Sequence, residues 1–69
     1  MNEILFGQRL KETRIEKGLK QEDLAKELKV KAATVSRWEN SLIEPDYLTL
    51  VKLAKFFKVS TDYLLGLEE

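Results

Sequence analysis

The chain contains no cysteine and no histidine among its 69 residues. Disulfide bonds, thiol catalysis and the usual zinc ligands are therefore excluded together. Proline and glycine are scarce as well, with one and three residues, so little interrupts regular structure. Apolar residues make up 43% of the chain and charged residues 35%, a composition typical of a small globular domain.

Long apolar runs are missing too. No stretch approaches the roughly 20 apolar residues that span a membrane, and residues 1–8 lack the basic region and apolar run of a signal peptide. We therefore expect a cytoplasmic protein with no membrane partner. The sequence also holds no carboxylate cluster, phosphate-binding loop or nucleophile–base pair. It predicts no enzyme, no cofactor, no metal and no small-molecule ligand.

The net charge is zero, which by itself does not favour a nucleic-acid partner. The charges are unevenly distributed along the chain, however. Residues 9–37 carry nine basic and five acidic side chains, a net charge of +4, and residues 38–69 carry three basic and six acidic ones, a net charge of −3. Such a chain can present a positive face to phosphate. The alternative is that these charges only solvate the helix surfaces.

The spacing of apolar residues is helical throughout the chain. Phe6 and Leu10 lie four residues apart in a first helix, which Gly18-Leu19 closes. A short second helix covers about residues 21–28, and a third follows after two or three residues, at about 31–40. The segments that follow add two further helices, so that the sequence predicts a compact all-α domain of five short helices.

The fourth and fifth helices begin at recognisable N-caps. Asp46, directly after Pro45, starts the fourth helix, and Ser60 starts a short fifth one that carries Tyr63 and Leu64. The inner stripe of the fourth helix is expected to consist of Tyr47, Leu50, Val51, Ala54 and Phe57.

The third helix has two different sides. With Ala32 set at zero on a helical wheel, one side, from 0° to about 140°, holds Ala32, Ala33, Ser36, Arg37 and Asn40. The opposite side, from about 240° to 340°, holds Val35, Trp38 and Glu39. Small side chains beside an arginine suit a helix pressed into the major groove of DNA. An ordinary amphipathic surface helix would show the same pattern.

Glu39 interrupts the apolar side of the third helix, where an isolated carboxylate is costly. Phe6, Leu10 and Arg14 are spaced by four, so Arg14 continues an apolar stripe of the first helix inward. One charged residue in each stripe predicts a structural ion pair between Arg14 and Glu39 that holds the third helix at a fixed angle. The alternative is that Arg14 extends outward to solvent or phosphate.

Several motifs agree in order and spacing with a known family. The run from Gln21 to Leu28, then Val30, then the run from Thr34 to Asn40 resembles the helix-turn-helix signature of the Cro/C1-type (phage repressor-like, XRE) family. The flanking Gly18-Leu19, Pro45-Asp46 and residues 59–66 are also similar, so the match covers about residues 10–65. It implies a five-helix lambda-repressor-like domain over 10–64, with the motif at 21–40 and a short tail at 65–69.

The resemblance implies a transcriptional regulator, most simply a repressor, that binds double-stranded DNA with its third helix in the major groove. The positions that read bases in the family correspond to Ala32, Ala33, Ser36 and Arg37. Those that contact phosphate correspond to Gln21 and Asn40, and Arg14 and Glu39 match the family's interhelical pair. Arg37 is expected to read guanine, and an alanine methyl to contact thymine. Trp38 is interpreted as a core residue, with a phosphate contact through its indole N–H as the alternative.

The chain departs from the family pattern at five positions. Lys20 and Lys31 replace the usual serine or threonine N-caps, which weakens each cap by about 1 kcal/mol but adds a candidate phosphate contact. Lys29, Ser41 and Lys58 replace glycines, and each substitution costs free energy if the position keeps a positive φ.

A single such domain contacts one half-site, so we expect a homodimer. The candidate dimer surface consists of Phe56, Leu65 and Leu67 with the segment Lys58–Tyr63, and the alternative is a monomeric domain. A second hypothesis for the function is an antitoxin or partner-controlled regulator that binds another protein through Leu42, Ile43 and Phe56.

Overall fold

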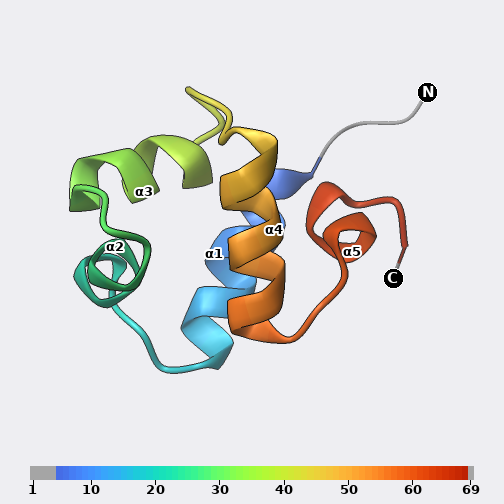
Figure 1. Ribbon diagram of the computed structural model, residues 1–69, viewed down its shortest axis with the longest axis horizontal. Coiled ribbons are helices and arrows are strands. Elements are labelled where there is room, and N and C mark those ends of the chain that lie inside the picture. The colour runs from blue at the N-terminus through green and yellow to red at the C-terminus, as the bar shows by residue number, and fades with distance from the viewer. Residues whose placement is uncertain (1–4, 69) are drawn as a thin grey trace.

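The computed structural model describes residues 5–68, and this part of the chain is built from five helices (Figure 1). They are α1 (Phe6–Glu16), α2 (Gln21–Leu28), α3 (Ala32–Glu39), α4 (Tyr47–Phe57) and α5 (Thr61–Leu65). In Figure 1, α1 and α4 occupy the middle of the molecule, with α2 and α3 on one side and α5 on the other. The expected all-α fold is confirmed. No helix in the described range is long and apolar enough to cross a membrane.

One hydrophobic core joins all five helices. Its ten buried residues are Phe6, Leu10, Leu24, Ala25, Val35, Trp38, Leu53, Ala54, Phe57 and Leu64. α1 packs against both α3 and α5, and α2 packs against α3 and α4. Burial of these apolar side chains is the main term that favours folding. Because α1 contacts elements on both sides of the molecule, it fixes the position of α3 relative to the rest of the core.

The two expected N-caps are confirmed. The side chain of Asp46 accepts a hydrogen bond from the backbone N–H of Thr49 at 2.8 Å, and Ser60 Oγ accepts one from the N–H of Tyr63 at 2.9 Å. The hydrogen bonds from Thr49 lower the pKa of Asp46 below its ordinary value, and the nearby Lys52 acts in the same direction. The capping hydrogen bond of Asp46 therefore fixes where α4 starts and where the preceding loop ends.

The starts of α2 and α3 lack such a cap, as the lysines at these positions predict. Neither Lys20 nor Lys31 caps its helix with its side chain, since an ammonium group has no acceptor. At α2 the carboxylate of Asp23 compensates by accepting a hydrogen bond from the backbone N–H of Lys20 at 2.8 Å.

The expected inner stripe of α4 is partly wrong. Ala54 and Phe57 are buried as predicted, but Tyr47 and Val51 are 73% and 39% exposed, and Leu53 is fully buried instead. The buried face of α4 is rotated about the helix axis by roughly 50° from the predicted face, which is half of the rotation from one residue to the next. Apolar residues lie on almost every side of α4, so their spacing does not determine which of them face the core.

Within residues 5–68, three non-glycine residues adopt the left-handed conformation. Lys29, Ser41 and Lys58 have φ angles of 58°, 60° and 59°. They are the three positions at which the sequence departs from glycine, and each keeps the backbone conformation that glycine adopts more easily. Lys29 and Lys58 each follow the last residue of a helix, where this conformation lets the chain turn away from the helix axis.

The positive φ at Lys58 predicts that a glycine at this position is more stable than an alanine, the opposite of their order within a helix. Lys58→Gly is expected to be more stable than Lys58→Ala by about 1 kcal/mol, because only the alanine carries a Cβ in the left-handed region. Both variants lack the lysine charge, so their difference isolates the backbone term. Thermal unfolding followed by circular dichroism measures it, and a more stable alanine variant would contradict the positive φ.

Gly7 lies where α1 approaches the end of α3. A Cβ atom at this position would be 2.7 Å from the carbonyl oxygens of both Trp38 and Glu39, and 2.8 Å from Ser41 Oγ. These separations are shorter than carbon and oxygen atoms in contact allow. Glycine is therefore required here by the close approach of two backbones rather than by its conformational freedom.

Gly7→Ala is expected to destabilise the protein by about 1–3 kcal/mol, the usual effect of overpacking. In an unobstructed helix the same change would stabilise by about 1 kcal/mol, because alanine is the better helix former. The matched control compares Lys11→Gly with Lys11→Ala, at an exposed position of α1. Urea unfolding curves give both values, and a Gly7→Ala protein as stable as the wild type would refute the close approach.

Candidate nucleic-acid interface

α2 and α3 pack against each other across a turn at residues 29–31. Lys29 ends α2 in the left-handed conformation, and the N–H of Val30 donates to the carbonyl oxygen of Ala25 at 2.9 Å. The side chain of Val30 packs against the core. The turn is therefore fixed both by a hydrogen bond and by an apolar contact, which sets the angle at which α3 leaves α2.

The inner side of α3 is anchored as the helical wheel predicts. Val35 is fully buried, and Trp38 and Glu39 are nearly so, with exposed fractions of 4% and 8%. The interpretation of Trp38 as a core residue is confirmed. Because bulky side chains fill this side, α3 has no freedom to rotate about its own axis.

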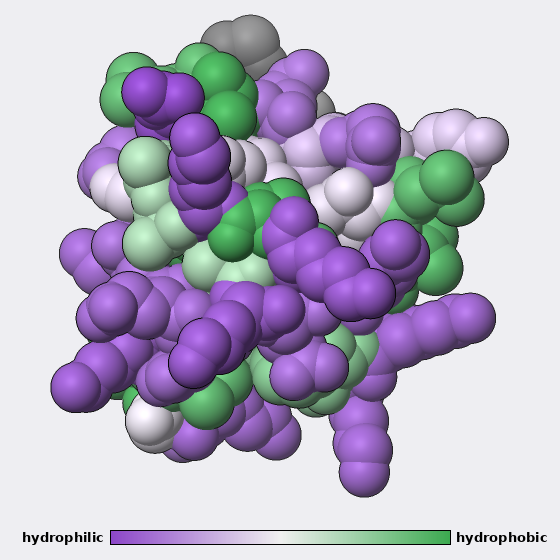
Figure 2. Space-filling model, turned by 60° about the vertical axis from the view of Figure 1, so that its left-hand side comes forward, coloured by the Kyte–Doolittle hydropathy of each residue, from purple (hydrophilic) through white to green (hydrophobic). Residues whose placement is uncertain are grey.

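The opposite side of α3 faces outward. Lys31, Ala33, Arg37 and Asn40 are exposed, whereas Ala32 and Ser36 are only half-exposed. Ala32 also packs against the core, so its methyl group is partly covered by the protein itself. Figure 2, in which the side of the molecule that carries α2 and α3 is turned forward, shows a largely hydrophilic surface with smaller apolar patches between the polar side chains and at the margins.

The expected ion pair between Arg14 and Glu39 is present. Arg14 Nε lies 2.6 Å from Glu39 Oε2, and Arg14 Nη2 lies 3.1 Å from Glu39 Oε1, so that the contact is bidentate. Arg14 Nη1 donates to the carbonyl oxygen of Leu19 at 2.8 Å. All three guanidinium nitrogens are thus engaged inside the protein, and the alternative in which Arg14 extends outward is wrong.

Gln21 joins this network, a contact that the sequence does not reveal. Its Nε2 donates to Glu39 Oε1 at 3.0 Å. The carboxylate of Glu39, which belongs to α3, therefore binds Arg14 of α1 and Gln21 of α2 and links the three helices. A buried carboxylate has more lone pairs than a single arginine can satisfy, so a second donor to Glu39 could be expected. The sequence offers several possible donors and does not single out Gln21.

Asn40 follows the last residue of α3, and its side chain bonds within the helix. Its Nδ2 lies 2.9 Å from the carbonyl oxygen of Ser36 and 3.3 Å from Ser36 Oγ. The side chain is exposed. The side chain of Asn40, a candidate phosphate contact, is therefore hydrogen-bonded to Ser36, a candidate base contact.

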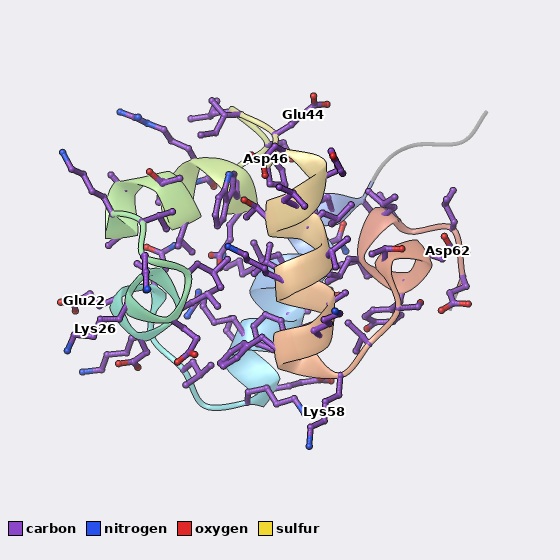
Figure 3. All side chains as sticks on the ribbon, in the orientation of Figure 1. Glu22, Lys26, Glu44, Asp46, Lys58 and Asp62 are labelled. Atoms are coloured by element: carbon purple, nitrogen blue, oxygen red, sulfur yellow. The ribbon has the colours of Figure 1, made fainter. Side chains whose placement is uncertain are left out.

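Charged side chains surround the motif but do not all face the same way. Lys20, at the start of α2, and Lys31, at the start of α3, are exposed. Glu22 and Lys26 extend from α2 away from α3 (Figure 3). In this view the acidic side chain of Glu22 therefore lies beside α2 and not over α3.

These features define a helix-turn-helix protein: two short helices packed together across a tight turn, with the second presenting an exposed side that its buried side holds in place. A family model described as helix-turn-helix matches residues 10–64. The chain belongs to this family, and the resemblance to Cro/C1-type proteins is confirmed.

The relatives are transcriptional regulators rather than enzymes. The HTH-type transcriptional regulator ImmR of Bacillus subtilis is 43% identical over 64 residues, which are 93% of this chain and 50% of the relative. The crystal structure of a transcriptional regulator from Listeria innocua superposes with a TM-score of 0.92 at 31% identity, covering 99% of this chain and 64% of that one. The chain thus spans about half the length of the curated relative.

A structure with bound DNA is also similar. The crystal structure of the c2 repressor of Salmonella phage P22 in complex with a synthetic operator has a TM-score of 0.83 at 36% identity. The match covers 88% of this chain and 92% of that chain.

The buried ion pair predicts strongly non-additive effects of substitution. Glu39→Leu alone is expected to destabilise the protein by roughly 3 kcal/mol or more, because Arg14 stays buried without a counter-charge. Combining it with Arg14→Met removes both charges and is expected to recover most of that loss. Free energies of unfolding of the wild type, both single variants and the double variant close the cycle. Simple additivity would show that the two side chains do not depend on each other.

Proposed function

We propose that this protein is a transcriptional regulator, acting as a repressor, that binds double-stranded DNA sequence-specifically. In this proposal α3 enters the major groove, and two copies bind a palindromic operator. The observation that carries it is the contrast between the two sides of α3: Val35 and Trp38 are locked in the core, while Ala33 and Arg37 are exposed. Small side chains beside one arginine let a helix approach base edges closely.

The similar repressor from phage P22 supports the proposal, since its structure contains a synthetic operator. We assign the reading of guanine to Arg37, whose two-pronged donor geometry matches the two acceptors of that base. Ala33 or the half-covered Ala32 contacts a thymine methyl group, and Ser36 supports the contacts of its neighbours. Because so few side chains read bases directly, DNA shape carries part of the specificity.

The contacts with phosphate come from both ends of the motif. Lys20 and Gln21 stand at the start of α2, Lys31 at the start of α3, and Asn40 at its end. Helix N-termini carry a partial positive charge and unpaired N–H groups, which favour an anion.

The dimer contact is proposed to involve Phe56, Leu65 and Leu67 with the segment Lys58–Tyr63. Phe56 is 38% exposed although its ring packs edge-on against Phe57, and Leu67 is 60% exposed. A two-fold contact would cover this apolar surface and place two copies of α3 about one helical turn of DNA apart. Selection of bound fragments from random duplex DNA tests the proposal: a symmetric motif is expected, and recovery of no enriched motif would refute sequence-specific binding.

A second candidate function rests on the loop between α3 and α4. Leu42 is 72% exposed and Ile43 42% exposed, which suits a regulator or antitoxin controlled by a protein partner. Co-purification with a tightly bound neighbouring gene product would favour this function over that of a stand-alone repressor.

Arg37→Ala is expected to weaken binding to the selected operator by about 1–3 kcal/mol and to relax the preference at one base pair. Arg37→Lys keeps the charge but loses the two-pronged contact, so it should restore general affinity and not specificity. Fluorescence anisotropy with the operator and its single-base variants measures both effects. An equal loss on every sequence would instead make Arg37 a phosphate contact.

Binding is expected to weaken steeply with salt, because the affinity depends logarithmically on salt with a slope of about −0.9 for each phosphate neutralised. Lys20→Ala should make this slope shallower by about one unit for each bound copy. Lys55→Ala is the matched control, because Lys55 lies in the last turn of α4, at the end of that helix away from α3 (Figure 1). An affinity that stays constant from low to physiological salt would contradict the proposed DNA face.

A further inference from the structure

The contact between Gln21 and Glu39 fixes which way the glutamine amide points. Gln21 Nε2 lies 3.0 Å from Glu39 Oε1. A carboxylate only accepts hydrogen bonds, so the amide must turn its nitrogen, not its oxygen, toward Glu39. One N–H of Nε2 is used in this contact. The second N–H is the group that Gln21 can offer to an anion outside the protein.

Glu39 cannot follow Gln21 if the glutamine moves. Arg14 holds both carboxylate oxygens, at 2.6 and 3.1 Å, and the side chain of Glu39 is only 2% exposed. Arg14 is held in turn by the carbonyl oxygen of Leu19 at 2.8 Å. The position of Glu39 Oε1 is therefore set by a rigid buried group rather than by the flexible surface side chain that it binds.

We propose that Glu39 is a positioning residue for DNA binding, which acts by holding the free N–H of Gln21 toward a phosphate at the start of α2. The inference rests on the proposed function and deepens it. A glutamine that is free in solution loses side-chain freedom when it binds a phosphate, whereas one that is already held loses little. The ion pair then has two effects: it fixes α3, and through Gln21 it prepares the phosphate contact of α2.

A contact with a purely structural role would behave differently. In that case Gln21 would matter for the stability of the fold but would contribute to binding by the same factor with or without Glu39. The coupling between residues 21 and 39 in DNA affinity is therefore the quantity to measure.

The experiment compares four proteins on the operator selected from random duplex DNA. They are the wild type, Gln21→Met, the paired variant Arg14→Met with Glu39→Leu, and the triple variant that combines all three substitutions. The paired variant leaves no lone buried charge and so keeps the domain folded, which circular dichroism verifies. Gln21→Met is expected to weaken binding about tenfold in the wild type, the usual effect of losing a hydrogen bond to a charged group. In the paired background, where nothing orients Gln21, the loss is expected to be less than about twofold.

Gln8 supplies the matched control. Its Nε2 lies 3.3 Å from Glu12 Oε2, so it is also a glutamine next to a glutamate, but both lie on α1 and the contact is exposed. Gln8→Met should leave the affinity unchanged in either background.

A second measurement does not depend on DNA. In the NMR spectrum of the free protein, the chemical shifts of the two side-chain amide protons of Gln21 are expected to differ clearly from those of a solvent-exposed glutamine. In the paired variant these shifts should move to the values of a solvent-exposed glutamine. The corresponding protons of Gln8 should not respond.

The possible failures are distinguishable. If Gln21→Met weakens binding equally in both backgrounds, or if its amide protons ignore the loss of Glu39, the positioning role is overturned while DNA binding stands. If the wild type binds no selected duplex, the proposed function falls and the inference falls with it.

Discussion

The buried carboxylate of Glu39 is the constraint on which the arrangement of the motif depends. Removing two charges from water is expensive, and the mutual attraction of the pair offsets this only when the geometry is good and the remaining donors and acceptors are filled. Here they are filled by groups from three different parts of the chain: Arg14 in α1, the carbonyl oxygen of Leu19 and the amide of Gln21 in α2. A displacement of any of these elements would leave a buried polar group without a partner. Apolar contacts hold α3 in the core, but the ion pair specifies its position.

Local chemistry was predictable from the sequence. The bounds of α2 and the N-caps Asp46 and Ser60 follow from residue types that act within one helical turn, so no tertiary information is needed to find them. The pair of Arg14 and Glu39 was predictable for a different reason: each charge interrupts an apolar stripe, and two such interruptions in one small core can compensate only each other. The positive φ at Lys29 was indicated only by the glycine that the family usually has there, and the sequence did not decide whether a lysine keeps that conformation.

What the sequence could not decide depends on the arrangement of whole elements. α4 is apolar on most of its surface, so the neighbouring helices determine its buried face, and Leu53 is buried whereas Val51 is exposed. The half-burial of Ala32 depends on how closely α3 approaches the core, which no spacing encodes. The contact of Gln21 with Glu39 could not be predicted either, because it joins residues of different helices and Gln21 does not interrupt an apolar stripe that would show which way it points.

The left-handed lysines show how a charge and a strain can be separated. Lys29 precedes the proposed recognition helix, and its strained backbone could be explained by a need for a cation near DNA. Lys58 has the same conformation, yet it lies at the opposite end of the molecule from α3 (Figure 3), so DNA cannot explain both. Both residues follow the C-terminus of a helix, where a cation gains about 0.3–1 kcal/mol from the helix dipole, and this offsets part of the strain of roughly 1–2 kcal/mol. The lysine at position 29 is therefore understandable without DNA, and the proposed function depends on α3 and on the start of α2 rather than on the turn between them.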